Sequence, residues 1–406
     1  MKANLYNQNF AALSSKQRTL FTELLEYACQ SLEPSKTKKE LAEQRYMSVG
    51  KWLAESDDIM FRGVEIYPQG SQRIGTTSKP VFREEFDLDF ICYLPNAEGI
   101  HPDICRKKVI ERIKENGNFK DLVCELNRGC RLNYADEFHL DITPGIPDQN
   151  HANEYGAISV PDKKLKEWKA SNPKGYAQDF DLKAKLEPTY VGFSDAMFAS
   201  ASLKSENIEE LPKHTMFKGI LRRAVQIMKR HRDLLFYENK NYDGKAPISI
   251  ILTTLAACAY KDLVNQQPFR NELEVLVSVV ESMTGYIETK VIDGKIEMWV
   301  TNPKNVHENF AEKWNVDTKR VEAFHYWHSD FVEKLRELAS VTSLPLIKAK
   351  LNALIGESSS SKAIEKHYEV LNETRDSNKL FVKKTGAIST AVTATPVKAN
   401  TFFGKS

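Results

Sequence analysis

The residues of this chain best suited to chemistry are two aspartates separated by a single leucine, Asp87-Leu88-Asp89. In an extended strand, residues i and i+2 share a face, so the two carboxylates project together while Phe86, Leu88 and Phe90 face a core. Neighbouring carboxylates repel each other, and burying them is unfavourable unless a positive charge lies between them. Mg2+ binds through a few carboxylates together with substrate phosphates. The segment therefore predicts that Asp87 and Asp89 form a metal platform.

A glycine–serine turn precedes this platform, with Ser71 sixteen residues before Asp87. Residues 64–67 predict a short strand, and residues 72–74 predict the start of a helix. Because free backbone N–H groups and the positive end of a helix dipole suit phosphate, Gly70 and Ser71 are predicted to hold the phosphates of a nucleotide. Either motif alone is usually a turn or a solvated strand end, but their order between two apolar strands favours a functional site.

A third carboxylate is expected from a neighbouring strand at residues 138–142. Its apolar residues alternate, which places Asp141 on the opposite face. Asp136 and Glu137 are rival candidates, but Asp136 lies at a turn and Glu137 is further from the strand end. Residues 122–134 predict a hairpin that leads into this strand. We therefore prefer Asp141 as the third metal ligand.

The remaining pattern predicts helices around one small sheet. The sheet is expected over residues 64–142, with its last strand ended by the Pro-Gly pair at 144–145. A small hairpin is expected around Asp293-Gly294. Helices are expected at residues 15–31, 36–55, 213–237, 248–264, 272–283, 305–340 and 361–374, with a linker at residues 356–361.

Composition and charge predict a cytoplasmic enzyme. No apolar run approaches the ~20 residues of a membrane span, and the first residues lack a signal-type apolar stretch. The six cysteines include no C-x-x-C pair, and Cys92, Cys124 and Cys258 are expected to be small core residues. The chain carries +2, but five lysines and no acidic residue follow Asp376. The rest therefore carries −3, which disfavours a non-specific nucleic-acid binder.

Taken in order, these motifs resemble the bacterial cGAS/DncV-like nucleotidyltransferases (CD-NTases) of the DNA polymerase β-like superfamily. The resemblance covers about residues 45–335 and adds the segments Trp168, Asn172–Tyr176, Lys229–Asp233, Pro247–Ile251 and Asn302–Trp314. It implies a bilobal α+β fold, with a nucleotidyltransferase core that has a small mixed sheet and N-terminal helices at residues 1–200. A helical lobe at 201–380 would complete the active-site cleft, and residues 381–406 would be a flexible basic tail. The spacing from Gly-Ser to the first aspartate is longer than usual, and residues 75–80 are expected to form a loop over the triphosphate.

The resemblance also assigns residues in the helical lobe. It assigns Lys229 to the nucleotide triphosphate, although basic residues at helical spacing usually form a solvated face. Ser249 opens the next helix and either donates to the same phosphates or is an ordinary N-cap. Tyr176 could stack on a base, but packing is the better interpretation. His231 is expected at the surface.

The activity that the resemblance implies is the condensation of NTPs, ATP or GTP, into a cyclic di- or trinucleotide that contains adenosine. Such products are second messengers in an anti-phage defence system (CBASS) and act on a separate effector protein. Two Mg2+ ions, or Mn2+, would be held by Asp87, Asp89 and Asp141, and Asp141 would help to take the proton of the acceptor hydroxyl. Neither a membrane nor an obligatory nucleic acid is expected as a partner.

Three other functions remain open. An RNA-directed transferase of the CCA-adding or poly(A) type is disfavoured by the slightly acidic body, which has no RNA-binding stripe. A small-molecule nucleotidyltransferase is disfavoured by the long helical lobe. A degenerate regulatory binding module is disfavoured because all three carboxylates are present. The base, the ring size and the linkage of a cyclic product cannot be inferred from these residues.

The end of the sequence carries a further motif. Residues 400–404, Asn-Thr-Phe-Phe-Gly, resemble the tail that related synthases present to a ubiquitin-ligase-like partner. Phe402 and Phe403 would be apolar anchors, and Gly404 would offer an unhindered backbone. Lys405 and Ser406 follow the glycine, which departs from that pattern. A frayed terminus with an incidental aromatic pair is the alternative.

Overall fold

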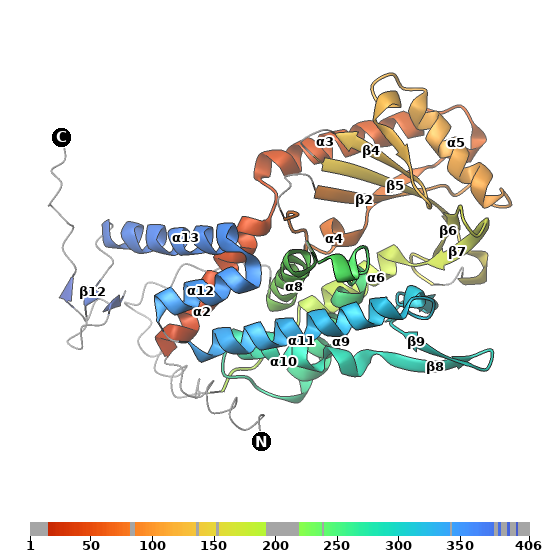
Figure 1. Cartoon of the computed structure of the whole chain (residues 1–406). Coiled ribbons are helices and arrows are strands. Elements are labelled where there is room, and N and C mark those ends of the chain that lie inside the picture. Colours follow the sequence, from red (N-terminus) through yellow and green to blue (C-terminus); the bar gives the residue numbers. More distant parts are fainter. Residues whose placement is uncertain are drawn as a thin grey trace, which may run out of the picture.

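The computed structural model describes residues 15–81, 86–134, 138–151, 154–191, 219–237, 239–341 and 343–376, together with three short strands. The fold is α+β and bilobal, as predicted: one lobe is built on a sheet and the other on helices (Figure 1). The short strands are β12 (Phe381–Val382), β13 (Ile388–Ser389) and β14 (Thr395–Pro396). Residues 397–406, with the aromatic pair, lie outside the described residues.

The sheet of the first lobe is mixed, and its central strands β2 and β5 run parallel. Its order is β1-β2-β5-β4-β3, and β5 continues into an antiparallel extension with β6 and β7. Helices α3 and α5 cover one face, as Figure 1 shows. The bounds are β1 Glu65–Pro68, β2 Phe86–Tyr93, β3 Val123–Glu125, β4 Cys130–Tyr134, β5 Phe138–Pro147, β6 Ile158–Asp162, β7 Glu167–Ser171, α3 Lys36–Ala54 and α5 Pro102–Lys114.

Helix α5 was missing from the sequence prediction. The side chain of His101 caps it by accepting from the backbone N–H of Asp103, and Pro102 occupies the first turn. The apolar residues of α5 do not recur at every turn of the helix. Those that are present are buried together in the core against the sheet: Cys105, Val109, Ile110 and Ile113. The segment therefore closes the sheet's apolar core.

Strand β5 corrects a second expectation, because it does not end at residues 144–145. Pro144 lies opposite Cys92 in the parallel pairing, and the carbonyl of Gly145 accepts from the backbone N–H of Leu94 at 2.8 Å. Ile146 then pairs with Ser159 of β6. Pro144 has no backbone N–H to donate to the ladder. The strand nevertheless continues beyond it, because Ile146 and Pro147 pair with β6.

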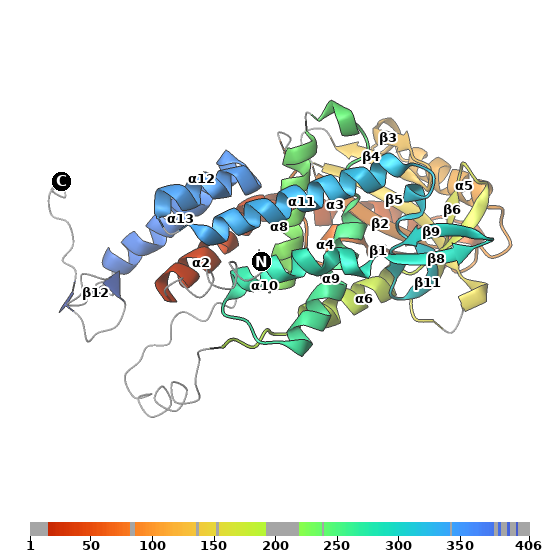
Figure 2. The same cartoon turned by 60° about the horizontal axis from the view of Figure 1, so that its bottom comes forward.

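The second lobe gathers its helices around one large apolar core. The bounds are α2 Ser15–Leu32, α6 Pro173–Ala184, α8 Ile220–Phe236, α9 Ser249–Gln266, α10 Glu272–Ser282, α11 Thr318–Ser340, α12 Leu344–Ile355 and α13 Glu357–Asp376. Figure 2 shows α11 running along this lobe, with α2, α12 and α13 gathered at the end far from the sheet. Helices α2 and α6 belong to this core although both precede residue 200. The predicted boundary itself falls among residues 192–218, outside the described residues.

Several element bounds differ from the sequence prediction. Within the described residues, α8 begins after Gly219, whose φ is +74°, so the predicted helical turn at residues 213–218 is untested. The expected linker at residues 356–361 is helical: only Gly356, with φ +86°, separates α12 from α13, and Ser360 is buried. The expected helix from residue 305 begins at Thr318, after strands β10 (Thr301–Asn302) and β11 (Asn305–Asn309).

The small hairpin is confirmed. Strands β8 (Glu288–Ile292) and β9 (Lys295–Trp299) are joined by Asp293 and Gly294. Both residues have positive φ, 49° and 76°, which suits the two-residue turn that matches the twist of a hairpin.

The cysteine expectation was wrong at one position. Cys92 is fully buried and Cys258 is partly buried, but Cys124 on β3 is exposed. In the short edge strand β3 an apolar context in the sequence does not ensure a buried face. Every helix in the part of the chain that the structure describes is too short or too polar to span a membrane.

Candidate active site

Strand register brings the three predicted carboxylates to one end of the sheet. Asp89 of β2 lies directly opposite Asp141 of β5, and Asp87 is two residues earlier on β2. Along β2 the apolar residues Phe86, Leu88 and Phe90 are buried, as the alternation predicted, and the aspartates lie on the other face. The rivals at positions 136 and 137 are outside the described residues.

Asp89 has the most unfavourable electrostatic environment of the three. Burial raises its pKa to about 6, and the carboxylates of Asp141 and Asp87 add to the effect. The glycine–serine turn packs directly against it. The backbone N–H of Gln69 donates to the carbonyl of Asp89 at 2.8 Å, and a Cβ on Gly70 would lie 2.7 Å from Asp89 Oδ2. With a φ of +60° as well, Gly70 is the residue that this close approach requires.

Two positive charges act on these carboxylates, Lys229 and Arg131, and the sequence prediction did not include Arg131. Arg131 of β4 lies opposite Asp141 in the antiparallel β4–β5 pairing. Its Nε and Nη2 donate to Oδ1 and Oδ2 of Asp141 at 2.7 and 2.8 Å. Nη2 also lies 3.2 Å from Oδ1 of Asp87. The hydrogen bonds to Asp141, the largest effect, hold the pKa of the guanidinium above its usual range.

The donor set suits a hard divalent cation. Carboxylate oxygens are the ligands that Mg2+ prefers. The raised pKa of Asp89 reflects its burial first and the neighbouring carboxylates of Asp141 and Asp87 second, while Lys229 and Arg131 oppose the shift. As placed, no three His, Cys, Asp or Glu side chains among the described residues form a group that could hold a metal ion. Both oxygens of Asp141 and one oxygen of Asp87 face the guanidinium instead, so an ion held by all three aspartates would have to take over Asp141 oxygens that Arg131 now occupies.

The turn at Gly70 and Ser71 differs from the prediction in one respect. It opens only a single helical turn, α4 (Gly70–Arg73), rather than a helix of useful length. A helix dipole builds up over several turns, so the argument for phosphate binding from the dipole does not apply here. The carbonyl of Ser71 accepts from the backbone N–H of Thr76 at 2.8 Å, which folds the following residues back on the turn.

Helix α8 holds residues 74–77 by three side chains on one of its faces. Arg222 Nε donates to the carbonyl of Ile74 at 2.9 Å, and Gln226 Nε2 donates to that of Thr77 at 2.8 Å. Lys229 Nζ donates to the carbonyl of Thr76 at 3.0 Å. We call these three contacts the clasp. The clasp fixes the loop that follows Gly70-Ser71 to the helical lobe.

Lys229 is not on a solvated face, because its side chain is 7% exposed. Burial lowers its pKa to about 8, and the nearby Arg232 contributes. Arg232 also links Lys229's helix to Ser249: its Nη1 donates to Ser249 Oγ at 2.9 Å. Ser249 is the first residue of α9, and its side chain forms no cap, so the N-cap alternative is wrong.

The two remaining residues have structural surroundings. Tyr176 is buried, and its hydroxyl lies 3.0 Å from Thr254 Oγ1, which confirms packing as its role. The expectation for His231 was wrong: it is 1% exposed, and its Nε2 lies 2.9 Å from Asp330 Oδ2 of α11. A helix that carries Lys229–Arg232 as a basic run looks solvated in sequence, but α8 is covered by α11 and α12.

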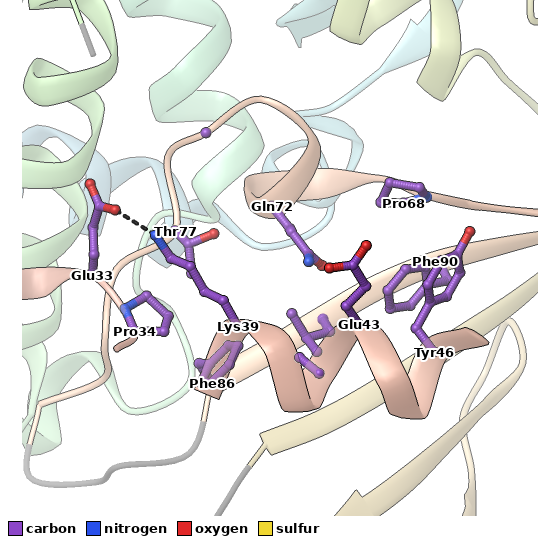
Figure 3. Close-up of a pocket in the computed structure, with 13 residues that line it drawn as sticks. Glu33, Pro34, Lys39, Glu43, Tyr46, Pro68, Gln72, Thr77, Phe86 and Phe90 are labelled. Carbon is purple, nitrogen blue, oxygen red and sulfur yellow. Dashed lines mark hydrogen bonds and ion pairs between the residues drawn. The ribbon is translucent and has the colours of Figure 1, made fainter. Parts of the chain in front are cut away.

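A cavity of about 410 Å³ lies near this site but on the other face of β2. Figure 3 shows its lining, with Phe86 and Phe90 of β2 on either side and Gln72 directed toward Glu43 of α3. Lys39 and Glu33 form an ion pair of 2.8 Å at its edge. Because Phe86 and Phe90 line it, it lies opposite the aspartates and is separate from the carboxylate site.

Comparisons with known proteins agree with this geometry. A family model described as the Second Messenger Oligonucleotide or Dinucleotide Synthetase domain (SMODS) matches residues 19–183. A Roseivirga ehrenbergii protein named c-di-GMP synthase is 32% identical over 400 residues, which span 97% of this chain and 99% of that protein. Cyclic dinucleotide synthase CdnG of Bradyrhizobium diazoefficiens is 24% identical over 291 residues, 67% of this chain and 65% of the relative.

Solved structures show the same fold. The CD-NTase CdnG of Bradyrhizobium diazoefficiens, in complex with GTP, superposes with a TM-score of 0.61 at 20% identity, covering 86% of this chain and 99% of that one. CdnC of E. coli MS115-1, in a complex with HORMA-deltaN, superposes with a TM-score of 0.56 at 13% identity, covering 83% and 97%.

The chain belongs to the CD-NTases, and its bilobal fold is the polymerase β-like fold of that family. It is a nucleotidyltransferase that synthesises cyclic oligonucleotides. The alternatives of an RNA-directed or small-molecule transferase are not favoured by these relatives.

Proposed function

We propose that this enzyme joins two GTP molecules into cyclic diguanylate at the end of β2 and β5, in a reaction that depends on Mg2+. The observation that supports the site is the register that sets Asp89 opposite Asp141, with Asp87 on the same face. Support for the base comes from the relative named c-di-GMP synthase, which matches this chain almost end to end. Adenosine in the product, which the sequence suggested, becomes the alternative outcome of the test below.

Each carboxylate has a proposed role in the transfer. Asp87, Asp89 and Asp141 would hold the Mg2+ ions, which neutralise the triphosphate and lower the pKa of the acceptor hydroxyl. Asp141, in the more buried position on β5, helps to take the proton of that hydroxyl. The hydroxyl oxygen attacks the α-phosphorus of the second GTP, the bond to the bridging oxygen breaks, and pyrophosphate leaves. A second transfer of the same kind closes the ring.

The nucleotide's phosphates would lie between the two lobes. Gly70 and Ser71 approach them from the sheet lobe, and Lys229 and Ser249 from the helical lobe. This arrangement is supported by the buried amine of Lys229, which reaches the clasped loop at the carbonyl of Thr76, and by Arg232, which joins the same helix to Ser249. Positioning and charge stabilisation account for most of the catalysis in phosphoryl transfer, so groups from both lobes are needed.

The test is product analysis with defined nucleotides. The purified protein is incubated with Mg2+ and GTP alone, ATP alone, or all four NTPs, and the products are identified by mass spectrometry before and after treatment with nuclease P1. We expect cyclic diguanylate from GTP alone and no adenosine in the mixture's main product. A main product that contains adenosine would restore the alternative base choice, and linear products alone would contradict cyclisation.

The partners of the enzyme are also proposed. The product would activate a separate effector protein. A regulatory protein partner has support from the CdnC neighbour solved with HORMA-deltaN. The tail at residues 400–404 would be the contact for a ubiquitin-ligase-like partner. Intact-mass analysis from the native host, with neighbouring genes present, should show a conjugated or shortened form, and only unmodified full-length protein would contradict this proposal.

A further inference from the structure

Arg131 occupies a position that the proposed reaction leaves unexplained. Its guanidinium uses both oxygens of Asp141 and reaches one oxygen of Asp87, so it joins carboxylates that project from two different strands. A forked guanidinium–carboxylate contact is among the strongest side-chain pairs because both hydrogen bonds are charge-assisted. These oxygens are the ones that a divalent cation would need.

A cation and the guanidinium cannot both occupy these oxygens as placed. The side chain of Asp141 is 16% exposed and that of Asp87 is 59% exposed, so the contact to Asp87 lies on the solvent side. Arg131 itself is 29% exposed, which leaves its Asp87 end free to move outward. Its position opposite Asp141 is set by the β4–β5 register, and that contact is the more buried of the two.

We propose that Arg131 is a latch on the metal site: it bridges Asp141 and Asp87 in the metal-free enzyme and must release oxygens of both before a divalent cation binds to all three aspartates. The proposal rests on the proposed role of the three aspartates as metal ligands. A free divalent ion then has to compete with the guanidinium of Arg131 for the carboxylate oxygens. Without the latch the same carboxylates bind the ion more tightly but lose their balancing charge when the ion is absent.

The test is Mn2+ titration in the absence of nucleotide, with free Mn2+ measured by EPR. Four proteins are compared: wild type, Arg131→Gln, Arg131→Lys and Arg128→Gln. Arg128 lies in the turn before β4, and its positive charge favours the ionised forms of Asp162 and Glu308. Arg128→Gln therefore removes an equal charge without touching the carboxylate site. Because an opposite charge nearby shifts carboxylate equilibria by tenfold or more, we expect Arg131→Gln to bind Mn2+ about tenfold more tightly. Arg131→Lys, which cannot form the fork, should fall between, and Arg128→Gln should match wild type.

Thermal unfolding supplies a second readout and a check that the variants fold. Arg131→Gln should melt below wild type without metal, and Mn2+ should raise its Tm by more than it raises that of wild type. Equal Mn2+ affinity in wild type and both Arg131 variants would overturn the latch while leaving the metal site intact. Tightening in Arg131→Gln with Arg131→Lys unchanged would also overturn it, because charge alone would then explain the effect. If Asp87→Asn/Asp89→Asn binds Mn2+ as wild type does, the proposed metal site fails and the latch with it.

Discussion

The buried position of Asp89 makes a prediction at the scale of one residue. Asp89→Asn should reduce product formation by at least about 10³-fold, because a proposed metal ligand is lost. The same change should leave the Tm of the metal-free protein unchanged or higher, since burial and two neighbouring carboxylates disfavour its charge. Mass spectrometry of the product and a thermal melt check this, with the exposed Asp121→Asn as the charge-matched control. A much lower Tm with activity retained would mean that Asp89 serves the core.

Asp87→Asn/Asp89→Asn should likewise abolish product without unfolding.

The lowered pKa of Lys229 predicts how GTP binding depends on pH. The amine is charged below its pKa of about 8 and neutral above it, so GTP affinity should fall as pH rises through about 8. Lys229→Met should bind GTP about tenfold more weakly at pH 7, because a charge-assisted contact is lost, and should lack this pH dependence. Titrations of both proteins with GTP between about pH 7 and 9 measure the difference. Parallel pH profiles in the two proteins would remove Lys229 from the phosphate site.

The sequence was informative about single residues where a strand's alternation determined the face. Asp87 and Asp89 share a face for that reason, and Asp141 follows from the same rule applied to β5. Arg131 could not be found in this way. One arginine in a strand is ordinary, and only the pairing of β4 with β5 brings it onto Asp141. Burial of His231 depends likewise on α11, which lies about a hundred residues further along the chain.

At the scale of elements, one of the three clasp contacts between α8 and the loop of residues 74–77 can be removed by a single substitution. Gln226 is fully buried, and Gln226→Leu leaves the Thr77 carbonyl without this donor. We expect a loss of about 1–3 kcal/mol in the free energy of unfolding. Hydrogen exchange of residues 74–79 should become faster, and the KM for GTP should rise several-fold. The exposed Gln44→Leu on α3 is the matched control. Unchanged exchange in the loop would show that the other two contacts suffice.

Element boundaries were predicted well where capping or turn residues were local. The Ser35 side chain caps α3 by accepting from the backbone N–H of Lys38, and Asp293-Gly294 forms the expected turn. The serine-rich stretch after Gly356 was expected to be a linker, because serine favours caps and turns. It is helical because packing buries Ser359 and Ser360. Tertiary contacts therefore overrode local propensity at this junction.

At the scale of the whole molecule, one buried arginine joins three helices. Arg223 of α8 lies 3.0 Å from a carboxylate oxygen of Glu26 on α2 and 3.0 Å from one of Glu272 on α10. Burial raises the pKa of Glu26, and Arg223 opposes that effect. Arg223→Met should therefore lower the free energy of unfolding by about 3–5 kcal/mol, since a buried carboxylate loses its partner. Adding Glu26→Gln should restore part of the loss. Urea denaturation measures both, and equal stability of the two variants would contradict the coupling.

The contact between α2 and α13 makes the two ends of the described helices depend on each other. Glu23 of α2 lies 3.1 Å from the ring of His367 on α13, and the helices cross at the end of the lobe (Figure 1). During synthesis, the ribosome must add more than three hundred residues before α2 can meet this partner. At typical rates of about 5–20 residues per second, α2 waits on the order of tens of seconds for this partner, although α8 and α10 can pack on it earlier. The sheet lobe has emerged complete well before that moment. Because α13 is the last of the described helices to be made, the side of α2 that packs on α13 is the last part of the helical lobe to be covered.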